Sequence, residues 1–482
     1  MARSRAPHLP GGPVLTYDAL YIGGRWTAPT TTDRVEVRSP HDQSLVGSAP
    51  LAAPAAVAAA RRAFDAGEWA GLAPERRRAL VERFNTLHAA RAAEIARLVT
   101  AENGTPAWFT ASLQTSLAEQ TGAFLRASEG LGWEEELKDG SLVRREPVGV
   151  VAAVIPWNAP HQSALVKVIP ALLAGCTVVL KVATETPLDG LLLGELFTEA
   201  GFPEGVVSIL PADRGTSEHL VRHPDVDKVA FTGSTRAGRR IASLAGEQLK
   251  RVSLELGGKS ASIVREDADL DALAAGVPFL AFSNNGQSCA GHTRLLVPRS
   301  RYEEVVETVR AAAEKVTYGD PADPAHFVGP LVSASQRERV RAYIRSGLDD
   351  GARLLVGGLD VPAHLEDGNY VRPTVLADVD NSWRVAREEI FGPVLVLIPY
   401  EDEDEAVRLA NDSPFGLSGG VWTTDPEAGL ALARRVRTGM VLVNSAAPGY
   451  EAPFGGYKAS GIGREFGTVG LGQYVEYKTI AR

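Results

Sequence analysis

The chain has little cysteine: Cys176 and Cys289 are its only two thiols among 482 residues. Two thiols so far apart in sequence do not form a disulfide framework, which predicts a reducing compartment, the cytoplasm. No apolar run approaches the roughly 20 residues that a membrane-spanning helix requires, so no membrane partner is expected. The first residues, MARSRAPHLPGGP, carry basic side chains without a following apolar stretch. They predict a disordered tail rather than a signal peptide.

The chain also lacks an excess of positive charge. Its formal net charge is -9, which argues against nucleic acid or an anionic membrane surface as a partner. The proportions of apolar residues (45%) and charged residues (23%) are typical of a globular enzyme. The length exceeds what one hydrophobic core usually organises, so two domains are expected.

From residue 150 onward, short apolar runs alternate with helix-like segments such as 188–201 and 269–282. The runs fall at 150–155, 177–182, 206–210, 228–233, 261–264, 294–298, 394–400 and 440–444. This alternation predicts a parallel sheet with helices on both faces. Apolar residues at helical spacing predict helix over 75–102, ended by Asn103 and Gly104. The segments 140–149 and 474–482 lie outside the alternation and predict edge strands, which often pair between subunits.

Polar residues follow three of the predicted strands. Asn158 comes just after the first strand, Lys181 closes the next, and the motif FTGSTRAG follows a third and opens a helix. Ligands of open α/β sheets bind at the carboxyl ends of the strands. In the last motif, Gly233, Ser234 and Gly238 allow a close backbone approach, and the helix N-terminus would face an anion.

Four other features have simpler structural interpretations. The stretch GGKS lacks the first glycine of a P-loop, because Ser253 stands there. The motif GLSGG runs into a strand-like VWTT rather than a helix, which favours a loop over a nucleophile elbow. His219 and His223 lie one helical turn apart without a third ligand, so a solvated helix face is expected and no metal. Cys176 begins an apolar strand and is expected to be a buried small hydrophobe.

Cys289 lies in a different setting, the polar and glycine-lined stretch NNGQSCAG. Backbone N–H groups of such a bend could stabilise a thiolate, although a packed structural cysteine remains an alternative. Glu255 lies in the apolar run SLELGGK, where a carboxylate is costly unless it has a partner or a function. A buried glutamate with a raised pKa near a thiol suits a two-step acyl chemistry, with a nucleophile and then a base for water.

Five motifs in order resemble the NAD(P)-dependent aldehyde dehydrogenase superfamily, over a stretch from about residue 20 to the end. They are FTGSTRAG, LELGGKS, GQSCAG, EEIFGPV and PFGGYKASGIGRE. The resemblance implies that the Cys289 thiolate attacks an aldehyde carbon, and that Asn158 and the Cys289 backbone N–H form the oxyanion hole. It implies that Glu255 activates the water that hydrolyses the thioester to a carboxylic acid. Glu465 is implied as a member of a proton relay.

The resemblance also implies NAD or NADP as the cofactor. The residues expected around the cofactor are Ile155, Pro156, Trp157, Lys181, Thr184, Gly233, Ser234, Gly238, Leu256, Gly257, Glu389 and Phe391. Those expected around the substrate are Ala159, Ser163, Val166 and Ser288. The modest size of the first three predicts a roomy tunnel that favours bulky aromatic or long aliphatic aldehydes.

Position 184 departs from the family pattern, which places an acidic residue there in NAD-preferring members. Thr184 is neutral and can donate to the extra phosphate of NADP, so NADP is expected to be accepted at a rate comparable with NAD. Glu185 is expected to point away from that site, provided that strand geometry persists this far.

The fold implied is α/β: a Rossmann-like parallel-sheet cofactor domain (1–128 and 149–257), an α/β catalytic domain (258–460) and a small β bridging element (129–148 and 461–482). The bridging element implies a homodimer or homotetramer. Three alternatives remain. A CoA-acylating aldehyde dehydrogenase would lack the water-activating Glu255. A catalytically silent NAD(P)-binding structural protein would not need Cys289, Glu255 and Asn158. A thiol esterase activity could accompany the main reaction.

Overall fold

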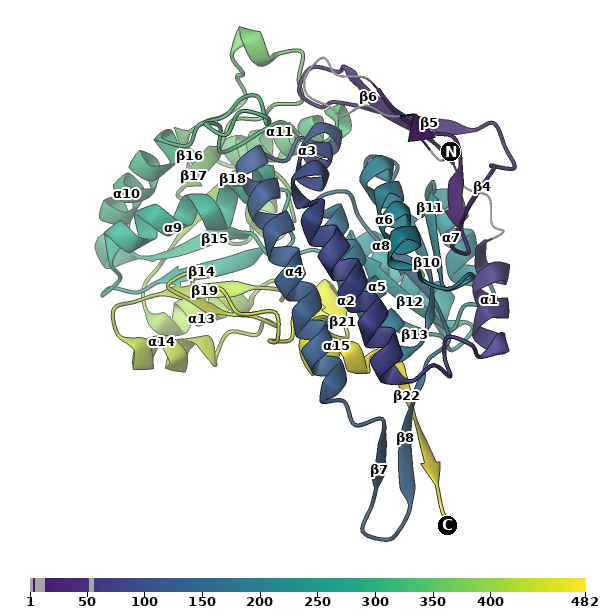
Figure 1. Cartoon of the computed structure of the whole chain (residues 1–482). Helices are drawn as coiled ribbons and strands as arrows, with labels where there is room; N and C mark the ends of the chain where they lie inside the picture. Colours follow the sequence, from purple (N-terminus) through teal and green to yellow (C-terminus); the bar gives the residue numbers. More distant parts are fainter. Residues whose placement is uncertain (1–2, 5–13, 52–55) are drawn as a thin grey trace.

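The computed structural model describes residues 3–4, 14–51 and 56–482, which form two α/β halves side by side (Figure 1). Most of the predicted N-terminal tail lies outside the described residues; Arg3–Ser4 form β1, which pairs with β2 (Leu15–Tyr17). With β5 (Arg34–Arg38) and β6 (Leu45–Pro50), these strands make a four-stranded sheet.

The first half contains an eight-stranded sheet in the order β21-β13-β12-β9-β10-β11-β3-β4. Its five central strands are parallel: β9 (Val150–Val154), β10 (Thr177–Val182), β11 (Val207–Pro211), β12 (Lys228–Thr232) and β13 (Arg251–Glu255). The antiparallel edge strands are β3 (Leu20–Ile22), β4 (Arg25–Thr27) and β21 (Gly461–Ile462). Its helices are α1 (Ala56–Ala66), α2 (Pro74–Ala90), α3 (Ala92–Asn103), α4 (Ala107–Glu129), α5 (Pro160–Ala174), α6 (Pro187–Ala200), α7 (Arg214–Arg222) and α8 (Thr235–Gly246).

The second half contains a seven-stranded sheet in the order β16-β17-β18-β15-β14-β19-β20. Its parallel strands are β14 (Ser260–Val264), β15 (His292–Pro298), β17 (Thr374–Ala377), β18 (Val394–Tyr400), β19 (Gly419–Trp422) and β20 (Leu442–Val443), and β16 (Arg353–Val356) is antiparallel. Its helices are α9 (Leu270–Phe282), α10 (Tyr302–Glu314), α11 (Ala334–Asp349), α12 (Arg384–Arg387), α13 (Glu403–Asn411) and α14 (Pro426–Ala433). The short α15 (Gly467–Gly472) packs against α4 and α5 of the first half (Figure 1).

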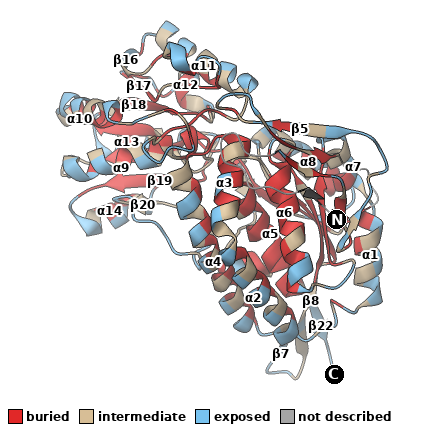
Figure 2. Cartoon of the chain, turned by 45° about the horizontal axis from the view of Figure 1, so that its top comes forward, coloured by how far each residue is buried: buried red, intermediate tan, exposed pale blue. Residues whose placement is uncertain are grey.

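Both large sheets are buried on both faces, because alternate residues of a strand pack into different hydrophobic clusters. In β9, Val151 and Ala153 join one cluster while Val150 and Val154 join another. In β18, the two faces likewise belong to two clusters. Figure 2 shows the strands inside and the exposed faces of the helices outside. The predicted parallel α/β architecture is therefore confirmed.

Two details refine the predicted elements. The helix expected over 75–102 divides at Arg91, which has φ -103° and ψ 7° and whose guanidinium pairs with Glu94 and Glu195. The second part ends at Gly104, as predicted, in the left-handed conformation (φ 77°) that favours glycine. A Cβ at this position would also approach Pro330 and Pro40 to 2.8 Å.

A fourth, small sheet projects from the body (Figure 1). It is formed by β7 (Glu134–Glu136), β8 (Leu142–Pro147) and β22 (Val475–Ile480), all antiparallel. The two segments predicted as strands outside the alternation thus pair with each other. Among the described residues, no helix is long and apolar enough to span a membrane.

Candidate active site

A cavity of 540 Å³ is lined by residues from both halves of the molecule. In the first half, these residues follow the carboxyl ends of β9, β10, β12 and β13. In the second half, they precede the amino ends of strands, as Cys289 does before β15 and Glu389 before β18. The predicted site residues that line it are Ile155, Pro156, Trp157, Asn158, Lys181, Thr184, Gly233, Ser234, Leu256, Cys289, Glu389 and Phe391. The two sheets therefore present opposite ends to one site.

The loop that carries Cys289 has an unusual backbone. Asn284, Asn285 and Gly286 are all left-handed, with φ of 53°, 61° and 67°, a conformation that asparagine and glycine tolerate best. A Cβ at Gly286 would collide with the backbone of Gly392. This tight bend turns the chain from α9 back toward β15 and leaves Cys289 half-buried at the cavity wall.

Asn158 lies beside this loop. Its side-chain Nδ2 donates to the carbonyl oxygen of Gln287 at 2.8 Å, and its own carbonyl oxygen accepts from Nδ2 of Asn284 at 2.9 Å. An amide nitrogen has two hydrogens, so one N–H of Asn158 remains for a ligand. The side chain predicted for the oxyanion hole and the predicted nucleophile thus lie on adjoining loops.

Glu255 ends β13 with only 3% of its surface exposed, and neither carboxylate oxygen has a hydrogen-bond partner among the described residues. Burial and the nearby Glu465 raise the pKa of Glu255 well above its ordinary value. Gly455 leaves room for the carboxylate, because a Cβ there would lie 2.6 Å from Oε1. A buried carboxylate that has no hydrogen-bond partner and a raised pKa can accept a proton from a bound water.

Glu465 is paired rather than free. Its Oε1 forms an ion pair with Nζ of Lys167, which also donates to the hydroxyl of Thr232 at 2.6 Å. Lys167 is a residue that sequence reasoning missed. The signal was a lysine in the otherwise apolar segment that became α5, which is almost entirely buried. A buried cation in such a helix predicts a charged partner.

The thiol of Cys289 is not acidic in this environment. Burial raises its pKa to about 12, and the carboxylates of Glu389, Glu255 and Glu465 contribute in the same direction. The cause is desolvation beside three acids, which acts even though part of the cysteine surface stays accessible at the cavity wall. Thiolate formation therefore needs a neighbouring proton acceptor or a change of environment.

The cavity suits a nicotinamide dinucleotide. Its volume lies in the range of small-molecule sites. Ser234 caps α8, accepting from the Ala237 N–H at 3.3 Å, and this helix N-terminus opens into the cavity next to Gly233. Glu389 accepts from the Gly258 N–H at 3.1 Å, and burial raises its pKa to about 7. Gly238 packs against Leu256, and Gly257 against the Glu389 carboxylate, so these glycines permit close packing around the site.

One expectation near the cavity is wrong. Glu185 does not point away from Thr184: it accepts a hydrogen bond from the Thr184 hydroxyl at 3.2 Å, and both line the cavity. The reason is that β10 ends at Val182, so the alternation of a strand no longer applies two residues later. Lys181 is the last residue but one of the strand, and burial lowers its pKa.

Other lining residues gave no sequence signal. Gln336 and Arg339 come from α11, whose amphipathic pattern is that of an ordinary surface helix. Gln336 donates to the Phe391 carbonyl oxygen at 2.7 Å, and Arg339 to the Glu389 carbonyl oxygen at 2.7 Å. Arg236, by contrast, lies inside the motif FTGSTRAG and could have been inferred.

The residues predicted for the substrate lie outside the lining of this cavity. Ser163 and Val166 are buried on α5, and Ala159 and Ser288 are half-buried in the adjoining loops. Their roles stay predictions.

The simpler structural interpretations of GLSGG and Cys176 are confirmed. Ser418 of GLSGG shares a 3.0 Å hydrogen bond with His292, and this loop leads into β19. In the described part of the chain, no group of His, Cys, Asp or Glu could hold a metal. Cys176 is fully buried just before β10.

Comparisons with known proteins agree with this geometry. A sequence model described as the aldehyde dehydrogenase family matches residues 26–480. Geranial dehydrogenase of Castellaniella defragrans is 46% identical over 475 residues, covering 97% of this chain and 99% of that protein. A 3-succinoylsemialdehyde-pyridine dehydrogenase of a Pseudomonas species is 41% identical, covering 96% and 98%.

Two solved structures have folds closely similar to that of this chain. A Mycobacterium tuberculosis aldehyde dehydrogenase complexed with NAD+ has a TM-score of 0.95 at 45% identity, covering 97% of this chain and 98% of that one. A mutant of aldehyde dehydrogenase C from Pseudomonas syringae, complexed with NAD+ and octanal, has a TM-score of 0.91 at 39% identity and covers 96% of each chain.

Proposed function

Because the chain belongs to the aldehyde dehydrogenase family and oxidises aldehydes with a nicotinamide dinucleotide, we propose how its residues divide that reaction. The observation that carries the proposal is the unpartnered, buried Glu255 on the strand that ends beside the cavity of Cys289. A nucleophile and a separate base for water are what oxidation to a free acid requires.

The first step is addition. The Cys289 sulfur bonds to the aldehyde carbon, and the carbonyl electron pair moves to oxygen. The free N–H of Asn158 and the backbone N–H of Cys289 donate to this alkoxide. Because burial and the nearby carboxylates of Glu389, Glu255 and Glu465 keep the thiol protonated, its proton must leave to water in the cavity before the attack.

Oxidation leaves a thioester on Cys289. The bound nicotinamide supplies the acceptor for the hydride that leaves the same carbon. Glu389, Gly233 and Ser234 are proposed to bind and orient the dinucleotide, with the α8 N-terminus facing its pyrophosphate. Phe391 packs edge-on against Trp157, with ring centroids 5.5 Å apart, and so closes this part of the cavity.

Hydrolysis completes the cycle. Glu255 takes a proton from a water whose oxygen attacks the thioester carbon, and the carbon–sulfur bond breaks to return the thiolate. The pair formed by Lys167 and Glu465 can receive the proton next, because Glu465 lies close enough to raise the pKa of Glu255. A CoA-acylating enzyme has no use for such a base, so Glu255 favours hydrolysis.

The direct test is the formation of reduced cofactor from an aldehyde, with and without CoA. We expect turnover without CoA and a free carboxylic acid as the product. Turnover that requires CoA would identify the acylating type instead, and cofactor binding without turnover would identify a silent structural protein.

For the substrate, we propose a bulky or long aliphatic aldehyde. Ala159 and Ser163, before and on α5, are small side chains, and the names of relatives that act on or bind geranial and octanal agree with this class. Comparing kcat/KM across an aldehyde panel tests it. A preference for acetaldehyde would contradict the proposal.

For the cofactor, we propose that NADP is accepted alongside NAD. Thr184 is neutral and Arg236 lines the same cavity, whereas Glu185 opposes a phosphate there. Thr184→Glu should weaken the use of NADP selectively by about 1–3 kcal/mol. Measuring kcat/KM for both cofactors decides it: a native preference for NAD above about a hundredfold, some 2.7 kcal/mol, would contradict the proposal.

We also propose a homodimer or homotetramer, with the described three-part division of the chain and a cytoplasmic location. The small sheet is the candidate interface, because it exposes Tyr477 (62%), Leu137 (41%) and Ile480 (37%). Light scattering should give the native chain the mass of a dimer or tetramer, and Tyr477→Glu should lower that mass. A monomeric mass for the native chain would contradict the proposal.

A further inference from the structure

Two consecutive asparagines precede the nucleophile, and they form a natural comparison. Asn284 and Asn285 share the left-handed conformation and are both buried, at 2% and 0% exposure. Their side chains nevertheless reach different partners. The mechanism proposed above uses neither of them.

Asn284 connects the two loops of the reaction centre. Its Nδ2 donates to the carbonyl oxygen of Asn158 at 2.9 Å and, more weakly, to that of Gln287 at 3.3 Å. Its Oδ1 accepts from the hydroxyl of Thr105 at 2.7 Å, and Thr105 is itself buried. The Gln287 carbonyl oxygen is the same atom that accepts from Nδ2 of Asn158.

Asn285 binds elsewhere. Its Nδ2 donates to the carbonyl oxygens of Gly104 at 2.9 Å and Pro330 at 2.8 Å. Its Oδ1 accepts from the Gly329 N–H at 2.6 Å. These bonds join the bend to the loops before α4 and α11, away from Asn158.

We propose that Asn284 and Thr105 are positioning residues that set the oxyanion hole. The inference rests on the proposed function. The two donors of the hole come from separate sheets, since Asn158 follows β9 and Cys289 precedes β15. A catalytic group displaced by about 1 Å loses much of its effect, so the spacing of the two loops has to be held.

The contacts of Asn284 meet that requirement. By binding the carbonyl oxygens of both Asn158 and Gln287, it fixes one loop against the other. The Gln287 carbonyl oxygen holds one amide hydrogen of Asn158 and leaves the other directed to the alkoxide. Thr105 orients the Asn284 amide, because its hydroxyl donates to Oδ1 and so leaves Nδ2 facing the two carbonyls.

The test compares Asn284→Gly with Asn285→Gly. Glycine keeps the left-handed backbone without strain, so both variants lose only the side chain. We expect Asn284→Gly to lower kcat for aldehyde oxidation by about 10- to 100-fold, less than the loss of a direct oxyanion donor. The rate of Cys289 alkylation by iodoacetamide, which forms no alkoxide, should stay within about threefold. Asn285→Gly should lower the melting temperature at least as much and keep kcat within about threefold.

A second pair of variants keeps the proposal testable if a glycine variant fails to fold. Thr105→Val removes the hydroxyl at constant shape and should lower kcat several-fold, and Thr105→Ser should restore it. Equal losses of kcat in Asn284→Gly and Asn285→Gly, or equal kcat in Thr105→Val and Thr105→Ser, would overturn the proposal. If the native chain did not oxidise aldehydes, or if Cys289→Ala still did, the proposed function itself would be contradicted.

Discussion

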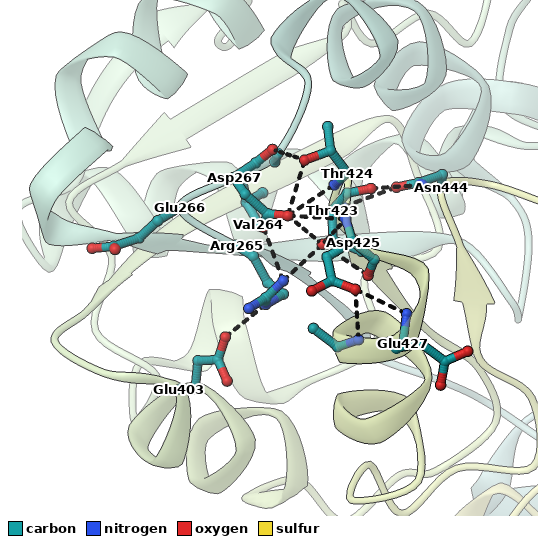
Figure 3. Close-up of polar contacts among 12 residues, drawn as sticks. Val264, Arg265, Glu266, Asp267, Glu403, Thr423, Thr424, Asp425, Glu427 and Asn444 are labelled. Carbon is teal, nitrogen blue, oxygen red and sulfur yellow. Dashed lines mark hydrogen bonds and ion pairs between the residues drawn. The ribbon is translucent and has the colours of Figure 1, made fainter.

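The polar groups at the two edges of the seven-stranded sheet differ in their hydrogen bonding. At the carboxyl edge, just past β14 and β19, Asp267 accepts hydrogen bonds from the Thr423 hydroxyl at 2.7 Å and from the N–H groups of Thr424 and Asp425 at 3.0 Å (Figure 3). Arg265 donates to its other oxygen at 3.0 Å. Burial raises the pKa of Asp267, but these hydrogen bonds outweigh it, and the net pKa lies below its ordinary value.

At the amino edge, some polar groups beside the cavity are buried without such partners. Nζ of Lys259, just before β14, has no hydrogen-bond partner in the described chain, and burial lowers its pKa to about 7. Burial raises the pKa of Cys289, just before β15, to about 12. Facing this edge from the other sheet, Glu255 at the carboxyl end of β13 is equally unpartnered in the described chain. The difference teaches that a carboxylate such as Asp267, held by several hydrogen bonds, contributes to stability, whereas Glu255 beside the cavity has no such bonds and keeps its oxygens available for chemistry.

The strongest way to sharpen this comparison is to remove the nucleophile at the amino edge. Cys289→Ala should lower kcat for aldehyde oxidation by several orders of magnitude, because no other group forms the thioester. Cofactor binding and the free energy of unfolding should change little. Retention of more than about one per cent of kcat would contradict the assignment of Cys289.

The next change tests the unpartnered base. Glu255→Gln should give a burst of reduced cofactor followed by turnover slowed by about 10²- to 10⁴-fold, since hydrolysis loses its base. At alkaline pH, the same change removes a negative charge that raises the pKa of Cys289, so alkylation should become faster. Rapid mixing and alkylation kinetics measure the two effects. Turnover at the native rate would show that Glu255 is not the base.

Removing the hydrogen bonds of Asp267 at the carboxyl edge should affect stability rather than activity. Asp267→Ala should lower the free energy of unfolding by about 2 kcal/mol, a modest value because a third of the side chain is exposed to solvent. The values of kcat and KM should stay within about twofold of native.

The pH dependence of this loss has a definite sign. The folded-state pKa of Asp267 is lowered, so its stabilising effect is present above the ordinary aspartate value of about 3.9. The advantage of the native chain over Asp267→Ala should therefore shrink as pH falls below about 4. Denaturant unfolding at several pH values measures it, and an advantage that grew on acidification would contradict the contacts in Figure 3.

The smallest effect is expected for the outer member of the same cluster. Glu403 binds Arg265 at 2.6 Å, but 47% of its side chain is exposed. Glu403→Ala should lower the free energy of unfolding by less than about 1 kcal/mol and leave kcat unchanged. A loss equal to that of Asp267→Ala would mean that the ion pair, not the hydrogen bonding of Asp267, stabilises this edge.

Much of the fold could be predicted from local patterns. The runs 177–182 and 394–400 coincide with β10 and β18, and Gly104 ends α3 where expected. The GLSGG loop was correctly separated from a nucleophile elbow by the strand that follows it. These predictions succeed because strands, helix ends at glycine and loops are indicated by hydrophobic periodicity and turn residues, which are local features of the chain.

The active-site motifs were also visible in the sequence, but their partners were not. The stretches around Cys289, Glu255 and Asn158 each carry polar residues in settings that suggest chemistry. The pairing of Lys167 with Glu465 joins residues 298 positions apart. Gln336 and Arg339 enter the cavity from a helix without any distinctive pattern.

What the sequence by itself determined is many of the strands and helices after residue 150, the family pattern and the identity of the candidate nucleophile and base. Only the tertiary structure decided that one sheet offers its carboxyl ends and the other its amino ends to the same cavity. It also decided that Glu185 faces Thr184, and that Asn284 rather than Asn285 touches the loop of Asn158. The physical reason is that backbone preference and periodicity are local, whereas side-chain partners and burial depend on segments brought together from distant parts of the chain.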